Sequence, residues 1–188
     1  MPKRLPPRYD LPKAAPEPLR LVQLFLNTKD HEHGREWLST PTQTRAWLAE
    51  RGFRATVTES DVTRLHSVRS ALHRFLLGEL NAAARATLER ETKRAPLRVT
   101  FDDAGLAPLE RGVDAFLGQL FAVVHDAVVD GSWPRLKGCR NCHWVFYDES
   151  KNRSATWCSM ELCGNRLKTK RYRRRHASTA PTTAPNAT

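Results

Sequence analysis

The clearest chemical signal in this sequence is a group of four cysteines, Cys139, Cys142, Cys158 and Cys163, with the spacing C-x2-C-x15-C-x4-C. The two-residue gap of the first pair lets two thiolates approach one ion, as in a zinc knuckle. Zinc in a closed structural site takes four soft ligands in a tetrahedron, and four thiolates supply them. We therefore expect one Zn²⁺ per chain, held by these residues.

Other uses of the four cysteines fit the pattern less well. All of them lie within residues 139–163, and in a reducing compartment such clustering favours a metal over disulfides or free thiols. An iron–sulfur cluster also takes four cysteines, and the spacing alone permits one. A redox C-x-x-C would need a thioredoxin-like βαβ context that this region lacks. A closed site has no open coordination position, so it does not predict catalysis.

The 15-residue spacer between Cys142 and Cys158 is long enough for a short hairpin. We expect residues 144–147 to form its first strand and residues 155–157 to return along it. A module of about 40 residues cannot build a sufficient hydrophobic core alone, so its folding should need the metal.

A strongly basic segment, CGNRLKTKRYRRRH, begins at the last cysteine. It contains good helix formers and no proline, and no acid follows Glu161. A solvated surface helix is the usual interpretation of a charge run, but such runs mix signs, whereas these cations repel one another unless they meet an anionic partner. The predicted nucleic-acid-binding residues are Arg166, Lys168, Lys170, Arg171, Arg173, Arg174 and Arg175.

The charge of the whole chain is concentrated in the same region. The 188 residues carry a formal net charge of +11. Residues 135–176 hold twelve Lys and Arg against three acids, which is +9 and leaves only +2 for the rest. Cations that neutralise phosphates release condensed counterions, so a polyanionic partner is favoured.

Composition divides the chain into four parts. Residues 1–19 hold six prolines and predict a disordered lead-in, and residues 177–188 predict a disordered tail. Residues 20–132 predict a mostly helical domain with a small β-hairpin, and residues 135–176 predict the zinc module. The expected fold class is therefore mainly α, an α+β domain followed by a treble-clef-like finger made of a knuckle, a short hairpin and a basic helix.

Helix signals are clear within the N-terminal domain. Thr40-Pro41 combines an N-cap with a proline at the first helical position, and the helix that it starts should stop near Gly52. A helix that opens at residue 59 or 60 carries an apolar stripe. Residues 19–26 fit a strand or a helix equally well. Further helices are expected at 80–93 and 112–130, and a hairpin at 96–101 with 106–109.

The cysteine region resembles a known family. The run Trp157-Cys158-Ser159-Met160-x-x-Cys163-Gly164-Asn165-Arg166-x-Lys168 is similar to the CGNR zinc fingers of bacterial proteins, as is the upstream Leu136-Lys137-Gly138-Cys139-x-x-Cys142. The resemblance implies that the four cysteines are zinc ligands and that Gly164-Asn165-Arg166 opens the helix.

The N-terminal part resembles, more loosely, the ABATE domain that usually precedes this finger. The similarity lies in Leu24-x-Leu26-Asn27-Thr28, in Leu38-Ser39-Thr40-Pro41 and in the long helix before the finger. This chain departs from the pattern by Lys29-Asp30-His31-Glu32-His33 and by its proline-rich lead-in. The resemblance implies a stress-response sensor domain joined to a DNA-binding finger in a bacterial transcription regulator.

Together these signals predict a cytoplasmic DNA-binding regulator, associated with the nucleoid when bound to DNA. An RNA- or ribosome-associated zinc protein is the alternative, and a module whose basic helix binds an acidic protein is the third choice. We expect the N-terminal domain to form a homodimer or to bind a small-molecule effector. The sequence shows no Ser/His/Asp grouping, P-loop or G-x-G-x-x-G that would support an enzyme.

Two weaker signals complete the prediction. No apolar run approaches the roughly 20 residues of a membrane span, so we expect no membrane partner. His31 and His33 form an H-x-H pair, but no third metal ligand lies nearby in sequence, so a polar loop is the better interpretation.

Overall fold

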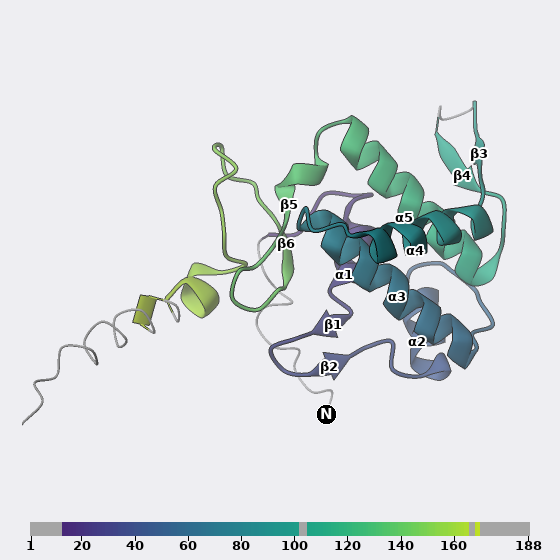
Figure 1. The fold of residues 1–188 in the computed structure, drawn as a ribbon, viewed down its shortest axis with the longest axis horizontal. Helices are drawn as coiled ribbons and strands as arrows, with labels where there is room; N and C mark the ends of the chain where they lie inside the picture. The colour runs from purple at the N-terminus through teal and green to yellow at the C-terminus, as the bar shows by residue number, and fades with distance from the viewer. Residues whose placement is uncertain (1–12, 102–104, 166–167, 170–188) are drawn as a thin grey trace, which may run out of the picture.

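The computed structural model describes residues 13–101, 105–165 and 168–169, and this part is mostly helical with small antiparallel hairpins (Figure 1). The helices are α1 (Arg20–Leu26), α2 (Pro41–Ala49), α3 (Glu59–Leu76), α4 (Ala82–Arg94) and α5 (Gly112–Val129). The paired strands are β1 (Lys29–Asp30) with β2 (Arg35–Glu36), β3 (Leu97–Val99) with β4 (Leu106–Pro108), and β5 (Leu136–Gly138) with β6 (Val145–Tyr147).

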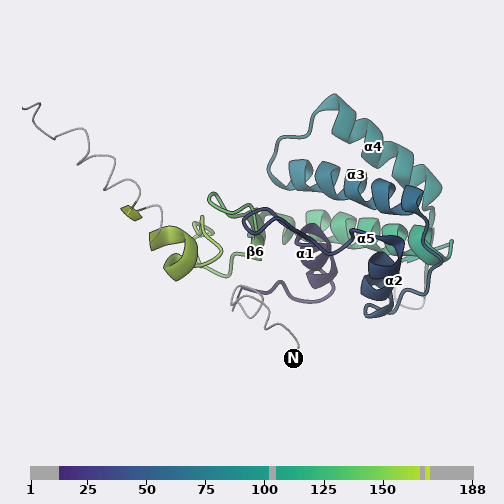
Figure 2. The ribbon, with the colours of Figure 1, turned by 90° about the horizontal axis from the view of Figure 1, so that it is seen from below.

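The long helices α4, α3 and α5 lie side by side, with α1 and α2 packed against them (Figure 2). The apolar stripe of α3 and the apolar face of α5 meet in the core, where Leu65, Phe116 and Leu120 are completely buried. The larger of the two hydrophobic cores comes mostly from the helices. Burying each such side chain contributes roughly 1.5–3 kcal/mol, so this core supplies most of the hydrophobic stabilisation. The cysteine region follows at one end of this layer (Figure 1).

The predicted helix starts are confirmed by their caps. The Thr40 side chain accepts a hydrogen bond from the Gln43 N–H, and Pro41 takes the first helical position. Thr58 and Asp61 form a capping box at the start of α3. The hairpin β3–β4 is confirmed, and residues 19–26 prove to be helical.

Residues 13–19, which composition assigns to the lead-in, pack against the domain. Ala15 and Leu19 are buried in the main core. The Lys13 carbonyl accepts the Tyr147 N–H at 3.0 Å, and the Lys13 ammonium donates to the Trp157 carbonyl at 2.7 Å. This segment therefore ties the start of the helical domain to the cysteine region.

Helix α5 is long and apolar enough to cross a membrane, with a hydropathy of 1.4 over 18 residues. The expectation that no run approaches this length is therefore wrong. Half of the helix is buried inside the protein, and Phe116, Leu117 and Leu120 pack against the other helices. The apolar face of α5 thus belongs to the protein core.

The pairing of the strand at 145–147 differs from the prediction. We expected residues 155–157 to return along it, and this is wrong: β6 pairs with β5, with Lys137 opposite Phe146. Residues 155–157 form no strand; a 3.3 Å bond from the Arg140 N–H to the Thr156 carbonyl connects them to the knuckle, and the Ala155 N–H bonds to the Asp148 carboxylate at 2.9 Å. The pairing with β5 places Cys139 and Cys142 in the turn between the two strands, where both thiolates can reach one ion.

Strand β6 is shared by two cores because successive side chains of a strand point to opposite faces. Val145 and Tyr147 pack with the helices. Trp144 and Phe146 instead pack around the cysteines in a second core. The hairpin β5–β6 therefore connects the predicted ranges 20–132 and 135–176, because it contributes side chains to the core of each.

Asn27, at the end of α1, fixes strand β6 to the helices through a pair of hydrogen bonds, here called the Asn27 clamp. Its side-chain amide donates to the Val145 carbonyl at 2.8 Å and its oxygen accepts the Val145 N–H at 2.7 Å. The Gln23 amide donates to the same carbonyl at 3.1 Å. All of these groups are buried, so the clamp satisfies backbone atoms that water cannot reach.

Replacing Asn27 by alanine should lower the free energy of unfolding by about 2–3 kcal/mol, because the buried Val145 N–H loses its acceptor. The measurement is urea denaturation of the zinc-loaded protein. Asn152→Ala, at an exposed position of the cysteine region, is the matched control and should change stability by less than about 0.5 kcal/mol. Equal effects of the two variants would show that the clamp is unimportant.

Candidate metal centre

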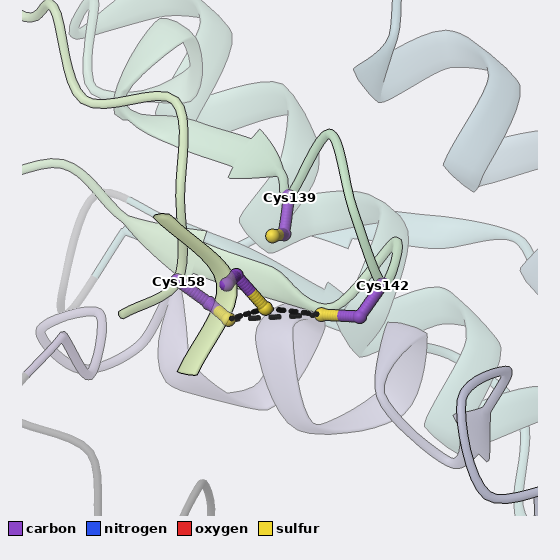
Figure 3. A group of neighbouring side chains, drawn as sticks. Cys139, Cys142 and Cys158 are labelled. Atoms are coloured by element: carbon purple, nitrogen blue, oxygen red, sulfur yellow. Dashed lines mark hydrogen bonds between the residues drawn. The ribbon is translucent and has the colours of Figure 1, made fainter. Parts of the chain in front are cut away.

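The four cysteines come together at the end of the β5–β6 hairpin. Cys139 and Cys142 lie in the turn between the strands, Cys158 follows the long loop after β6, and Cys163 lies in a π-helical turn, Met160–Gly164. All four are buried, with at most 3% of each exposed. Figure 3 shows the side chains of Cys139, Cys142 and Cys158 converging.

The distances between the sulfur atoms fit one tetrahedral ion. All four sulfurs lie within 4.8 Å of one another. The three distances among Cys142, Cys158 and Cys163 are each 3.6 Å. A zinc–sulfur bond of about 2.3 Å in a tetrahedron places the sulfurs about 3.8 Å apart. An iron–sulfur cube would separate the sulfurs further, because each cysteine binds a different iron, so the geometry favours a single ion.

Four thiols this close cannot all ionise unless a cation compensates their charge. Hydrogen bonds with Cys142 and Cys158 lower the pKa of Cys139 far below its ordinary value. The hydrogen bond to Cys139 raises the pKa of Cys142 to about 12, and bonds to Cys139 and Cys142 raise the pKa of Cys158. A bound Zn²⁺ neutralises the thiolates directly, so this donor set fits zinc.

The first cysteine pair has the backbone of a knuckle. The Cys139 N–H donates to the Trp144 carbonyl and the His143 N–H donates to the Cys139 carbonyl, both at 2.9 Å. His143 adopts a left-handed conformation with φ of 61°, which closes the turn. The Asn141 amide donates to the Cys163 sulfur at 3.5 Å and connects the knuckle to the second pair.

Asp148 organises the loop that carries the chain back to Cys158. Its buried carboxylate accepts the Lys137 ammonium at 2.7 Å, and the backbone N–H groups of Ser150 and Ala155 at 3.0 and 2.9 Å. Burial alone would raise the pKa of Asp148, but these hydrogen bonds lower it below its usual range. The carboxylate is therefore charged throughout the neutral range.

Ser159 positions the last ligand. Its hydroxyl accepts the Leu162 N–H at 3.3 Å, and its carbonyl accepts the Cys163 N–H at 3.0 Å. This cap starts the π-helical turn and brings Cys163 under the knuckle.

The basic helix is described only at its start. Asn165, Lys168 and Thr169 are helical, and the Thr169 hydroxyl donates to the Asn165 carbonyl at 3.0 Å. Lys168 is exposed, as a contact to nucleic acid requires. The other predicted contact residues lie outside the described residues: Arg166, Lys170, Arg171, Arg173, Arg174 and Arg175.

Sequence reasoning missed a second grouping, made of His31, His73 and His143. The ring of His31 lies 6.4 Å from that of His73 and 5.8 Å from that of His143. His33 instead bonds to Asp30 at 2.7 Å, so the H-x-H pair does not act together. Within the described ranges, the cysteines are the group with metal-binding geometry. Nothing in the sequence relates histidines so far apart along the chain.

Replacing Cys158 by serine should remove stoichiometric zinc and unfold the segment after Tyr147, because three thiolates no longer close the site. Elemental analysis and near-ultraviolet circular dichroism measure the two effects. Ser154→Ala, on the exposed part of the same loop, should keep one zinc per chain. Iron in place of zinc in the unaltered protein would contradict the assignment.

Replacing Asp148 by asparagine should destabilise the protein by about 2–3 kcal/mol at neutral pH, because Lys137 loses its charged partner and the loop loses its anchor. Because the pKa of Asp148 is lower in the folded protein than in the unfolded chain, this stabilisation is complete above the pKa of an unfolded aspartate, about 4. It is lost as pH falls further, through the folded pKa. Urea denaturation at several pH values measures this contribution. The exposed neighbour offers the control Glu149→Gln, and equal losses in both variants would contradict the role of Asp148.

Comparison with known families agrees with this geometry. Residues 135–176 match the model of the CGNR zinc finger. Residues 19–130 match the ABATE model, described as "Putative stress-induced transcription regulator". A search of proteins with curated functions gives no match.

The ABATE match covers more than half of the chain, and the finger match contains all four clustered cysteines. The chain therefore belongs to the ABATE family, whose description is "Putative stress-induced transcription regulator", and carries a CGNR zinc finger with one four-cysteine zinc site.

Proposed function

We propose that the protein is a cytoplasmic, non-enzymatic regulator that binds DNA through the zinc finger and the basic helix behind it. The observation that carries the proposal is the position of the basic run directly after Cys163. Zinc fixes the start of the helix, and seven cations follow within residues 166–175 of the sequence. Family membership supports a regulatory role, because the family is described as "Putative stress-induced transcription regulator".

The charge distribution supports a nucleic acid as the partner. The finger range carries a net +9, whereas the remainder of the chain carries +2. Among the cations of this range, Arg140, Lys151 and Arg153 are exposed on the finger itself. Such a surface attracts phosphates, and each neutralised phosphate contributes through the release of counterions.

The order of residues along the basic segment supports different roles for its first and its later cations. In a helix that lies in the major groove, the first residues are nearest the base edges and later cations are nearest the phosphates. Arg166 is then the candidate for reading guanine, because its planar guanidinium matches the two guanine acceptors. The cations from Arg173 to Arg175 are candidates for phosphate contacts.

Replacing Arg173, Arg174 or Arg175 by alanine should weaken binding to all DNA sequences alike and reduce the salt slope by about one per residue. Fluorescence anisotropy at several salt concentrations gives both quantities. Arg85→Ala removes an exposed arginine from α4, far from the finger in sequence, and should leave the slope unchanged. A full-length protein with no salt-dependent DNA affinity would overturn the proposal.

Replacing Arg166 by alanine should cost about 1–3 kcal/mol on the preferred DNA site and relax specificity there. The competing role is to brace the knuckle by donating to backbone carbonyls. In that case the variant loses zinc or stability and binds every sequence equally poorly. Zinc content, melting temperature and affinity for two DNA sequences, measured on one preparation, distinguish the two roles.

The other proposed partners have separate tests. Preference for double-stranded RNA over DNA in the same anisotropy assay would favour the RNA- or ribosome-associated alternative. Sedimentation of the full-length chain tests the proposed homodimer. The proposed small-molecule effector needs a site, and the histidine grouping provides a candidate.

A further inference from the structure

A pocket lies where the helical domain meets the zinc knuckle. Its volume is about 460 Å³, within the range of sites for small ligands. Its lining comes from the β1–β2 segment, from the second half of α3 and from the knuckle itself. The residues that give it its chemistry are Lys29, His31, Arg69, His73, Arg74 and His143.

The lining is cationic, and part of that charge is uncompensated. Arg69 is engaged by Glu36 through two bonds, of 2.7 and 2.6 Å. Lys29 lies 3.9 Å from the same carboxylate. Arg74 is exposed and has no ion-pair partner within the described part of the chain. Glu79 is the acid that lines the pocket. The pocket therefore has unused capacity to hold negative charge.

The pKa values of two pocket histidines are lowered, in part by neighbouring positive groups. Burial lowers the pKa of His31 below its ordinary value, and the nearby His143, Lys29 and Arg69 lower it further against the opposing charge of Asp30. Burial also lowers the pKa of His73; its bond to the His143 carbonyl and the nearby Glu79 oppose this shift, and the His31 and His143 rings add to it. A bound anion would relieve this repulsion and could accept a ring N–H of His31.

His73 also connects the pocket to the metal centre. Its Nε2 atom donates to the His143 carbonyl at 3.3 Å, and His143 directly follows the zinc ligand Cys142. Arg74 is the next residue of α3. A ligand that contacts both Arg74 and His143 would therefore touch the helical domain and the knuckle at once.

We propose that this pocket binds a small oxyanion, a phosphate- or carboxylate-bearing metabolite. Arg74 supplies the charge-assisted bond and His31 supplies a further donor, whereas the Nε2 N–H of His73 is already used by the His143 carbonyl. The proposal is independent of DNA binding, because it concerns a concave site made by α3, the β1–β2 segment and the knuckle turn, and not the basic helix. A second zinc ion is the competing occupant, but the three histidines do not form a metal-binding group.

The test is calorimetric titration of the full-length, zinc-loaded protein at constant ionic strength. Inorganic phosphate and glycerol 3-phosphate probe phosphate binding, and succinate probes carboxylate binding. We expect one site per chain for at least one probe. Arg74→Gln and His31→Gln should each weaken that binding about tenfold, the loss expected for one charge-assisted hydrogen bond.

Matched controls decide whether the pocket is responsible. Arg45→Gln, on α2, and His125→Gln, on α5, remove exposed side chains of the same types and should leave affinity unchanged. Equal weakening by the controls, or no binding of any probe at millimolar concentration, would overturn the proposal. So would a second bound zinc that Arg74→Gln leaves in place and His31→Gln removes. Loss of DNA affinity in the pocket variants without any probe binding would also overturn it.

Discussion

The constraint on which the structure depends is the charge of four buried thiolates. Their sulfur atoms share a space no wider than 4.8 Å, and no protein cation occupies that space among the described residues. A divalent ion is the natural compensation, and its binding supplies folding free energy that the small second core lacks. The knuckle positions two ligands, and the loop anchored by Asp148 and the turn capped by Ser159 position one each around a single ion.

The hairpin β5–β6 connects the metal centre to the helical domain. Its strands face the helices on one side and the cysteines on the other, so one pair of strands serves both cores. Asn27 fixes the hairpin to α1 by satisfying both backbone groups of Val145. The finger is thus held against the helical domain by buried hydrogen bonds, and a ligand that binds between the two parts can influence both.

Much of the fold could be predicted because its signals are local. The caps at Thr40 and Thr58 lie in single turns, and the cysteine spacing needs no tertiary information. The partner of β6 could not be predicted in this way, because residues 136–138 and 155–157 are both short and offer similar strands. The Asn27 clamp spans 118 residues, and the contact between His73 and His143 spans 70. Such contacts arise only when the helices have packed.

The most direct measurement is X-ray absorption at the zinc edge of the full-length protein. The account predicts one zinc per chain with four sulfur neighbours at about 2.3 Å. A nitrogen or oxygen atom in place of one sulfur would contradict it, as would a shell of metal neighbours typical of a cluster.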